Sequence, residues 1–123
     1  MKVLISTIIL LSIHMVSLSP KKRFILLFAD NSSNKYLQEQ LQILQSDKPS
    51  LKERDLEIKT YFASHDQALF NTKSIKANFT FLLIGKDGGE KLRSTKPIAL
   101  AKLFGTIDAM PMRQDEMKHP HQN

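Results

Sequence analysis

Two short apolar runs constrain the fold of this chain more than any other feature. One spans Arg23 to Ala29 and the other spans Phe79 to Ile84, and neither shows a regular alternation of apolar and polar residues. A strand with one exposed face alternates in that way, so these runs predict strands that are buried on both faces. Because such strands need helices on both sides of their sheet, the sequence predicts an α/β domain.

The remaining segments supply helices and two further strands. Leu37, Leu41 and Leu44 recur at helical spacing, whereas residues 56–62 alternate as a half-buried strand does. The pair Asp87-Gly88 is typical of a tight hairpin turn. The other expected helices are one over 33–45, capped by the polar residues before it, a helical turn over 49–54 and a weak helix over 64–77. A returning strand is expected over 90–94. A last helix starts at Ser94 or Thr95 before Pro97 and runs to Met110, and a polar, frayed tail follows from Met112.

The expected order of elements is β-α-β-α-β-β-α. A strand-helix-strand unit followed by a hairpin and a final helix is the order of the thioredoxin-like core, in which the third strand lies antiparallel to the first. We therefore expect a four-stranded mixed sheet with helices on both faces. A chain of 123 residues has the size of one such domain.

The first segment has the pattern of a secretory signal peptide. Lys2 is basic, and residues 3–18 are apolar or carry hydroxyl groups apart from His14. This apolar core is shorter than the roughly 20 residues that span a bilayer, which favours a cleaved signal over the alternative, a membrane anchor. The product is then periplasmic or extracellular, with no stable membrane span. The expected segments are a signal peptide over 1–19, a folded domain over 20–117 and a disordered tail over 118–123.

The charge of the chain is basic, with 18 Lys and Arg residues against 12 Asp and Glu residues. One lysine lies in the expected signal peptide, which leaves 17 basic against 12 acidic residues. A basic domain binds nucleic acid, anionic lipid or an acidic partner. Export and the lack of a nucleic-acid-binding motif argue against nucleic acid. We expect an acidic protein or a polyanion in the cell envelope.

Several segments resemble an uncharacterised family that is known as a domain of unknown function. The resemblance covers about residues 23–117 and is most specific in the pair Leu83 to Arg93 and Ile107 to Arg113, with weaker matches over Phe24 to Asp30 and Leu51 to Ile58. That family is peroxiredoxin-like in fold and occurs in short exported bacterial proteins. It is similar to modules of secreted sushi-repeat and extracellular-matrix proteins. The resemblance implies a fold but no activity.

The redox chemistry of that fold is absent from this chain. Its enzymes carry a reactive cysteine after the first strand and a cis-proline before the third strand. Here the first position is the loop Asp30 to Asn34, the second is Ala77 to Thr80, and the whole sequence lacks cysteine. Both thiol exchange and thiol peroxidation need a thiolate. We therefore expect neither a thiol oxidoreductase nor a peroxidase, and we predict no cofactor and no metal.

Two groups of residues are candidate binding sites. Lys86, Lys91, Arg93 and Lys96 bring four cations to the hairpin, either to dock an acidic partner or to protect an edge strand from unwanted pairing. Asp30, Ser32 and Ser33 lie at a helix start, where serine needs a base to act as a nucleophile. The first hypothesis is an exported, non-catalytic binding or structural module. The alternative is a cysteine-independent enzyme or small-ligand-binding protein that uses the Asp30 to Asn34 loop.

Overall fold

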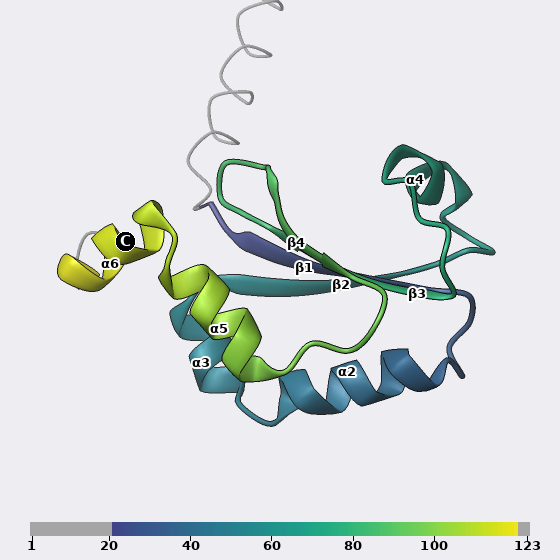
Figure 1. The fold of residues 1–123 in the computed structure, drawn as a ribbon, viewed down its shortest axis with the longest axis horizontal. Coiled ribbons are helices and arrows are strands. Elements are labelled where there is room, and N and C mark those ends of the chain that lie inside the picture. Colours follow the sequence, from purple (N-terminus) through teal and green to yellow (C-terminus); the bar gives the residue numbers. More distant parts are fainter. Residues whose placement is uncertain (1–20, 121–123) are drawn as a thin grey trace, which may run out of the picture.

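A four-stranded sheet with helices on both faces forms the domain in the computed structural model (Figure 1). The structure describes residues 21–120, so the expected signal peptide over 1–19 lies outside the described residues, as do residues 121–123 of the expected tail. The elements in chain order are β1 (Arg23–Ala29), α2 (Lys35–Gln45), α3 (Lys48–Glu53), β2 (Leu56–Phe62), α4 (Gln67–Thr72), β3 (Phe79–Ile84), β4 (Glu90–Ser94), α5 (Leu100–Asp108) and α6 (Pro111–Lys118).

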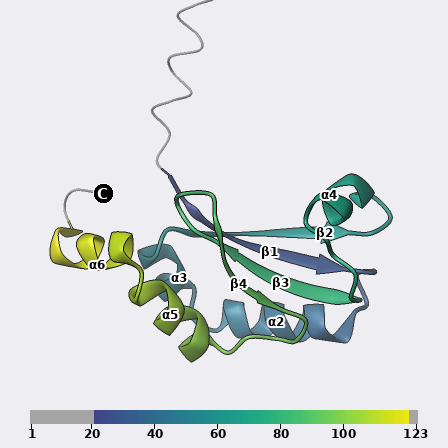
Figure 2. The same cartoon turned by 45° about the horizontal axis from the view of Figure 1, so that its top comes forward.

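The strand order in the sheet is β2-β1-β3-β4. β1 and β2 are parallel, whereas β3 is antiparallel to both β1 and β4. The mixed sheet and the antiparallel third strand confirm the prediction. Helices α2, α3 and α5 cover one face and the short α4 covers the other (Figures 1 and 2). The two predicted fully buried strands, β1 and β3, are the central pair, and β2 and β4 are the edges.

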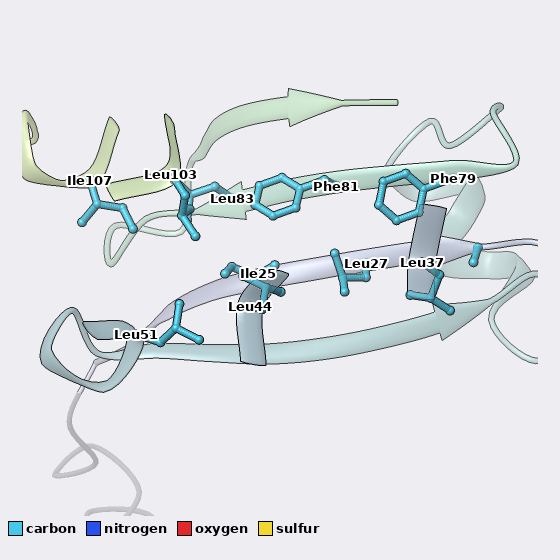
Figure 3. Close-up of a cluster of buried hydrophobic side chains, with 11 residues drawn as sticks. Ile25, Leu27, Leu37, Leu44, Leu51, Phe79, Phe81, Leu83, Leu103 and Ile107 are labelled. Atoms are coloured by element: carbon cyan, nitrogen blue, oxygen red, sulfur yellow. The ribbon is translucent and has the colours of Figure 1, made fainter. Parts of the chain in front are cut away.

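The larger core lies between the sheet and α2, α3 and α5. Figure 3 shows side chains of β1 and β3 directed toward those of the three helices. The smaller core on the opposite face contains Phe28, whose ring lies 5.1 Å from Phe70 of α4 and 5.3 Å from Tyr61 of β2. The buried members of the larger core are Ile25, Leu27, Ala29, Leu37, Leu44, Leu51, Phe79, Phe81, Leu83, Leu103 and Ile107.

Helices α2 and α5 start later than predicted, and a polar side chain explains each of these two differences. The Oδ1 atom of Asn34 accepts a hydrogen bond of 3.0 Å from the backbone of Leu37, so Asn34 caps α2 and Ser33 lies outside it. Helix α5 starts at Leu100. The buried amide of Gln40 binds both backbone groups of Ile98, at 2.6 and 3.0 Å, and holds this segment outside the helix.

The expected frayed tail from Met112 is wrong for most of its length. Residues from Pro111 to Lys118 form α6, which buries the polar side chains Arg113 and Glu116. Polarity argues against packing only when the polar groups lack partners, and these two have them. Within residues 21–120 no helix is both long and apolar enough to cross a bilayer.

Candidate functional site

Charged side chains gather at the end of the sheet where β1 begins and β3 ends. Figure 1 places α6 and the hairpin turn between β3 and β4 at this same end. Four elements, β1, α3, α5 and α6, and two loops, the one between α3 and β2 and the hairpin turn, contribute residues that lie far apart in the sequence. We call the group the charged cluster; it consists of Arg23, Glu53, Arg54, Asp55, Lys86, Asp108, Arg113 and Glu116.

The centre of the charged cluster is a two-point contact between Arg23 and Glu116. The guanidinium donates hydrogen bonds of 3.1 and 2.8 Å to the two carboxylate oxygens, and the side chains are only 1% and 6% exposed. Arg23 also donates to the carbonyl of Arg54 at 3.0 Å. Among the described residues, its Nε is the one buried side-chain nitrogen or oxygen without a partner. The contact joins the first residue of β1 to α6.

Lys86 completes the charge balance around Glu116. Its Nζ lies 2.7 Å from Oδ2 of Asp55 and 3.2 Å from Oε2 of Glu116. Burial raises the pKa of Glu116, but hydrogen bonds from Arg23 and Lys86 lower it by more than burial raises it. The pKa of Glu116 therefore lies below its ordinary value. Asp55 has a φ of 54°, a left-handed conformation that places its carboxylate before β2.

A second set of ion pairs adjoins the first. Arg54 donates to both oxygens of Asp108, at 3.0 and 2.8 Å, and Arg113 donates to Asp108 at 3.2 Å and to Glu53 at 3.1 Å. The hydrogen bonds from Arg54 and then Arg113 hold the pKa of Asp108 below its ordinary value, against the effect of burial. The charged cluster has four cations and four carboxylates. Its charges are therefore compensated internally, which is typical of a group that holds elements together.

The four hairpin cations of the sequence analysis do not form one patch. Lys86 is 10% exposed and belongs to the charged cluster. Lys91 lies 2.8 Å from Asp87, whose pKa its hydrogen bond lowers. Arg93 turns toward α4, where it binds the carbonyl of Lys73 at 2.7 Å as well as Glu90. Lys96 is exposed.

Two hollows flank the hairpin turn and share Gly85 and Lys86. The larger, of about 530 Å³, has an apolar floor of Phe24 and Ile84 and a rim that includes the exposed Lys21 and Lys22. The smaller hollow, of about 280 Å³, lies on the side of α6. It is lined by Arg23, Gly85, Lys86, Asp87, Lys91, Met110, Pro111 and Met112.

The other candidate site, the loop Asp30 to Asn34, lies at the opposite end of the sheet. The side chain of Asn34 donates to Asp30 at 2.8 Å and to the carbonyl of Asn78 at 3.0 Å. The hydrogen bond from Asn34 holds the pKa of Asp30 below its ordinary value. The carbonyl of Ser32 accepts from Gln38 at 3.4 Å. The polar atoms of this loop thus serve largely to fold the loop itself.

Ser32 and Ser33 are exposed, and within residues 21–120 neither hydroxyl forms a hydrogen bond with a carboxylate or an imidazole. Within the part of the chain that the structure describes, no hydrogen bond joins either hydroxyl to His65. Nor does that part contain a group of three or more His, Asp and Glu residues arranged to hold a metal ion.

Sequence reasoning missed the residues that organise the hairpin end. The polarity of the segment from Met112 predicts a frayed tail that contains Arg113 and Glu116, and the apolar run of β1 predicts Arg23 only as its charged first residue. One signal was present: Arg113 and Glu116 are three residues apart, which places them on the same face of a helix.

The architecture is that of the thioredoxin fold. A structure of thioredoxin-2, a component of malaria parasite protein secretion machinery, matches with a TM-score of 0.63 at 12% identity, over 75% of this chain and 86% of that one. Chloroplastic thioredoxin z matches with a TM-score of 0.60 at 19% identity, over 82% and 89%. A further malarial protein matches with a TM-score of 0.60 at 14% identity, over 71% and 94%. At these identities the similarity shows the fold alone.

The family is shown by the sequence. A family described as a domain of unknown function, DUF4174, matches residues 14–116, and the chain belongs to that family. No curated protein sequence matches significantly. The expected membership of an uncharacterised family with a thioredoxin-like fold is confirmed.

Proposed function

We propose that this chain is an exported, non-catalytic thioredoxin-like module that binds an acidic protein partner at the hairpin end of its sheet. The observation that carries the proposal is the pair of hollows beside the hairpin turn. Each is lined by apolar residues and by several cations, with a single acidic residue, Glu57 in the larger hollow and Asp87 in the smaller. Such a surface suits a partner segment that carries both carboxylates and apolar side chains.

The charged cluster supports this function by fixing the shape of the surface. The contacts of Arg23 and Lys86 with Glu116 join β1, the hairpin turn and α6, so the hollows lie between elements that are held together. A surface that is ordered before binding loses less conformational entropy when the partner docks. Met112, which is 48% exposed, adds apolar area beside the smaller hollow.

The hairpin cations Lys86, Lys91 and Arg93 contribute to the proposed binding surface in different ways. Lys86 supports the floor from within, because its charge is used by Asp55 and Glu116. Lys91 lines the smaller hollow, while Arg93 is directed to α4. Lys21 and Lys22 are exposed and provide positive charge at the rim of the larger hollow.

The alternative site at Asp30 to Asn34 is supported less well. Its polar groups are joined to one another and to Asn78, and the loop holds no thiol. An enzyme that uses this loop needs a base beside Ser32 or Ser33. The purified protein should reduce insulin disulfides and consume peroxide only at the buffer rate, because both reactions need a thiolate. Turnover above that rate, in protein that has been purified a second time, contradicts the non-catalytic assignment.

The binding proposal is tested by a pull-down from cell-envelope extract with the protein produced from the full 123-residue sequence. Reversing both rim charges in Lys21→Glu/Lys22→Glu should reduce partner recovery at least fivefold, and recovery should fall as salt rises. The matched control Lys35→Glu/Lys102→Glu makes the same change of charge at exposed helix positions and should retain the partner. Equal recovery by both double variants, independent of salt, excludes this surface.

The export proposal has its own test. N-terminal sequencing and intact-mass measurement of the envelope-fraction protein should find a chain that begins near residue 20. A chain that retains Met1 in the membrane pellet contradicts cleavage.

A further inference from the structure

The two edges of the sheet differ in how far they are protected against pairing with another strand. β4 is short, has an irregularity in its register opposite Leu83 and Ile84, and carries the cations Lys91 and Arg93. These are features that keep an edge strand from pairing. β2 is longer, pairs with β1 in an unbroken register and contains no proline. It therefore presents a regular edge.

Hydrogen bonds to β1 identify which residues of β2 direct their backbone groups outward. Ala63 donates to Ala29 at 3.2 Å, and the carbonyl of Asp55 accepts from Arg23 at 2.9 Å. The odd-numbered residues of β2 therefore bind β1. Because the direction alternates along a strand, the even-numbered residues Leu56, Ile58, Thr60 and Phe62 direct their N–H and C=O groups away from the sheet.

One end of this open edge is already satisfied. The backbone N–H of Phe62 donates to the carboxylate of Asp66 at 3.0 Å, and its carbonyl accepts from the backbone of His65 and Asp66. Among the described residues, no comparable contact involves the outward groups of Leu56, Ile58 or Thr60. The open stretch of edge thus runs from Leu56 to Thr60.

We propose that a second copy of this chain pairs with this stretch, with the two β2 strands antiparallel and centred on Ile58. In that register Ile58 lies opposite its own counterpart, and Leu56 lies opposite Thr60 of the second copy. All outward N–H and C=O groups of the three residues then form hydrogen bonds. Glu57 comes opposite Lys59 of the second copy, and Lys59 opposite its Glu57, at the positions where facing side chains are closest.

Charge selects this register over its neighbours. A pairing centred on Lys59 sets Lys59 opposite itself, and one centred on Glu57 sets Glu57 opposite itself. Like charges directly opposite are destabilising, whereas opposite charges are stabilising. Both neighbouring registers also leave an outward residue of the open stretch without its partner. The order Glu57-Ile58-Lys59 is therefore self-complementary only when the twofold axis passes through Ile58.

Apolar area on one face favours the same pairing. Ile58, Leu56 and Leu51 form the apolar part of a hollow of about 410 Å³ beside α3, whose other lining residues are Lys22, Lys48, Lys52 and Asp55. In the paired strands, Ile58 of the second copy lies next to Ile58 on this face. The two charged positions lie on the opposite face, because side chains alternate along the strand.

Analytical ultracentrifugation of the protein produced from the full 123-residue sequence tests this pairing. The wild-type chain should show a concentration-dependent dimer, and Glu57→Lys and Lys59→Glu should each raise the dimer Kd about tenfold, because two facing pairs change from attractive to repulsive. The matched controls Glu39→Lys and Lys102→Glu change the same charges at exposed helix positions and should leave the Kd unchanged.

Mixing the two weakened variants provides the decisive measurement. A Glu57→Lys chain opposite a Lys59→Glu chain has opposite charges at every facing position, so the mixture should form a heterodimer at least as tightly as the wild type forms its dimer. The double variant Glu57→Lys/Lys59→Glu should likewise dimerise. A monomeric wild type, or a mixture that associates no better than its separate components, overturns the proposal. The measurement uses the purified chain alone and needs no other partner.

Discussion

The two ends of the sheet hold their polar residues in opposite ways. At the polar loop, Asp30 and Asn34 are four residues apart and lie at the surface, where the hydrogen bonds between them are local. At the hairpin end, Arg23 and Glu116 are 93 residues apart and almost fully buried. In thioredoxin-like enzymes the chemistry occurs at the first end. In this chain the buried ion pairs lie at the second end, beside the hairpin turn.

The difference indicates that the structure depends on particular residues at the hairpin end more than at the polar loop. Buried ion pairs are weak contributors to stability but fix which elements lie together, since a buried charge without its partner is very unfavourable. The charged cluster therefore makes the position of α6 depend on particular residues of β1 and the hairpin turn. The polar loop needs only a capped helix. Four predictions follow this contrast from the largest expected effect to the smallest.

Replacing Arg23 by Met should cause the largest loss of stability. The substitution removes the two-point contact of Glu116 and leaves this buried carboxylate with Lys86 at 3.2 Å and Arg113 at 3.9 Å; breaking a buried pair typically costs roughly 3–5 kcal/mol. Urea unfolding followed by circular dichroism measures the free energy of unfolding. The double variant Arg23→Met/Glu116→Leu removes both charges and should lose clearly less than the single variant. A single variant within about 1 kcal/mol of the wild type contradicts a buried pair.

Acid should destabilise the domain through Glu116 and Asp108. Both have a folded-state pKa below the ordinary value, so between the folded and unfolded pKa values the unfolded chain binds more protons and stability rises with pH. The contribution is complete above an unfolded-state pKa of about 4 and is lost as the pH falls through the lower folded-state pKa. Urea midpoints measured from pH 6 to pH 2 should fall accordingly. Glu116→Gln should be less stable at pH 6 and show a shallower decline; an unchanged slope removes Glu116 from this account.

At the polar loop, Asn34→Ala should cost about 1 kcal/mol, the usual effect of removing a helix N-cap. The control Asn34→Ser keeps an N-cap acceptor but loses the contacts with Asp30 and Asn78, so it should lie between the wild type and the alanine variant. Thermal unfolding is sufficient to rank the three. A loss as large as that of Arg23→Met removes the contrast between the two ends.

The smallest effect is expected for Lys91→Ala in the hairpin. Its ion pair with Asp87 is exposed, and water and salt screen such contacts. The Tm difference between the wild type and Lys91→Ala should be smaller than the Tm difference between the alanine and serine variants of Asn34. At high salt the wild type and Lys91→Ala should have the same Tm. A marked fall of the Tm shows that Lys91 stabilises the hairpin by more than an exposed ion pair contributes.

The fold was largely predictable because its elements depend on local patterns. The apolar runs at Arg23–Ala29 and Phe79–Ile84 and the alternation over Leu56–Phe62 correspond to β1, β3 and β2. The start of α5 was not predictable in this way. It depends on the amide of Gln40, which reaches a backbone segment 58 residues further along the chain.

The centre of the charged cluster, the contact between Arg23 and Glu116, was not predictable for the same reason. Arg113 and Glu116 are polar in a polar segment, and only the three-dimensional position of Arg23 and Lys86 makes them core residues. Local polarity predicts exposure, whereas pairing over long distances reverses it. The sequence predicts four cations in the hairpin, but it does not predict which groups they contact or in which direction their side chains point.

The separation of Arg23 and Glu116 also bears on the order in which the protein is made. Translation produces the guanidinium 93 residues before the carboxylate that neutralises it. The contact cannot form before Glu116 has been synthesised, and by then all four strands of the sheet have been made. A nascent chain that ends before Glu116 contains every strand of the sheet yet carries an uncompensated cation at the first residue of β1. Truncated products should therefore be open to proteases while the finished protein is not.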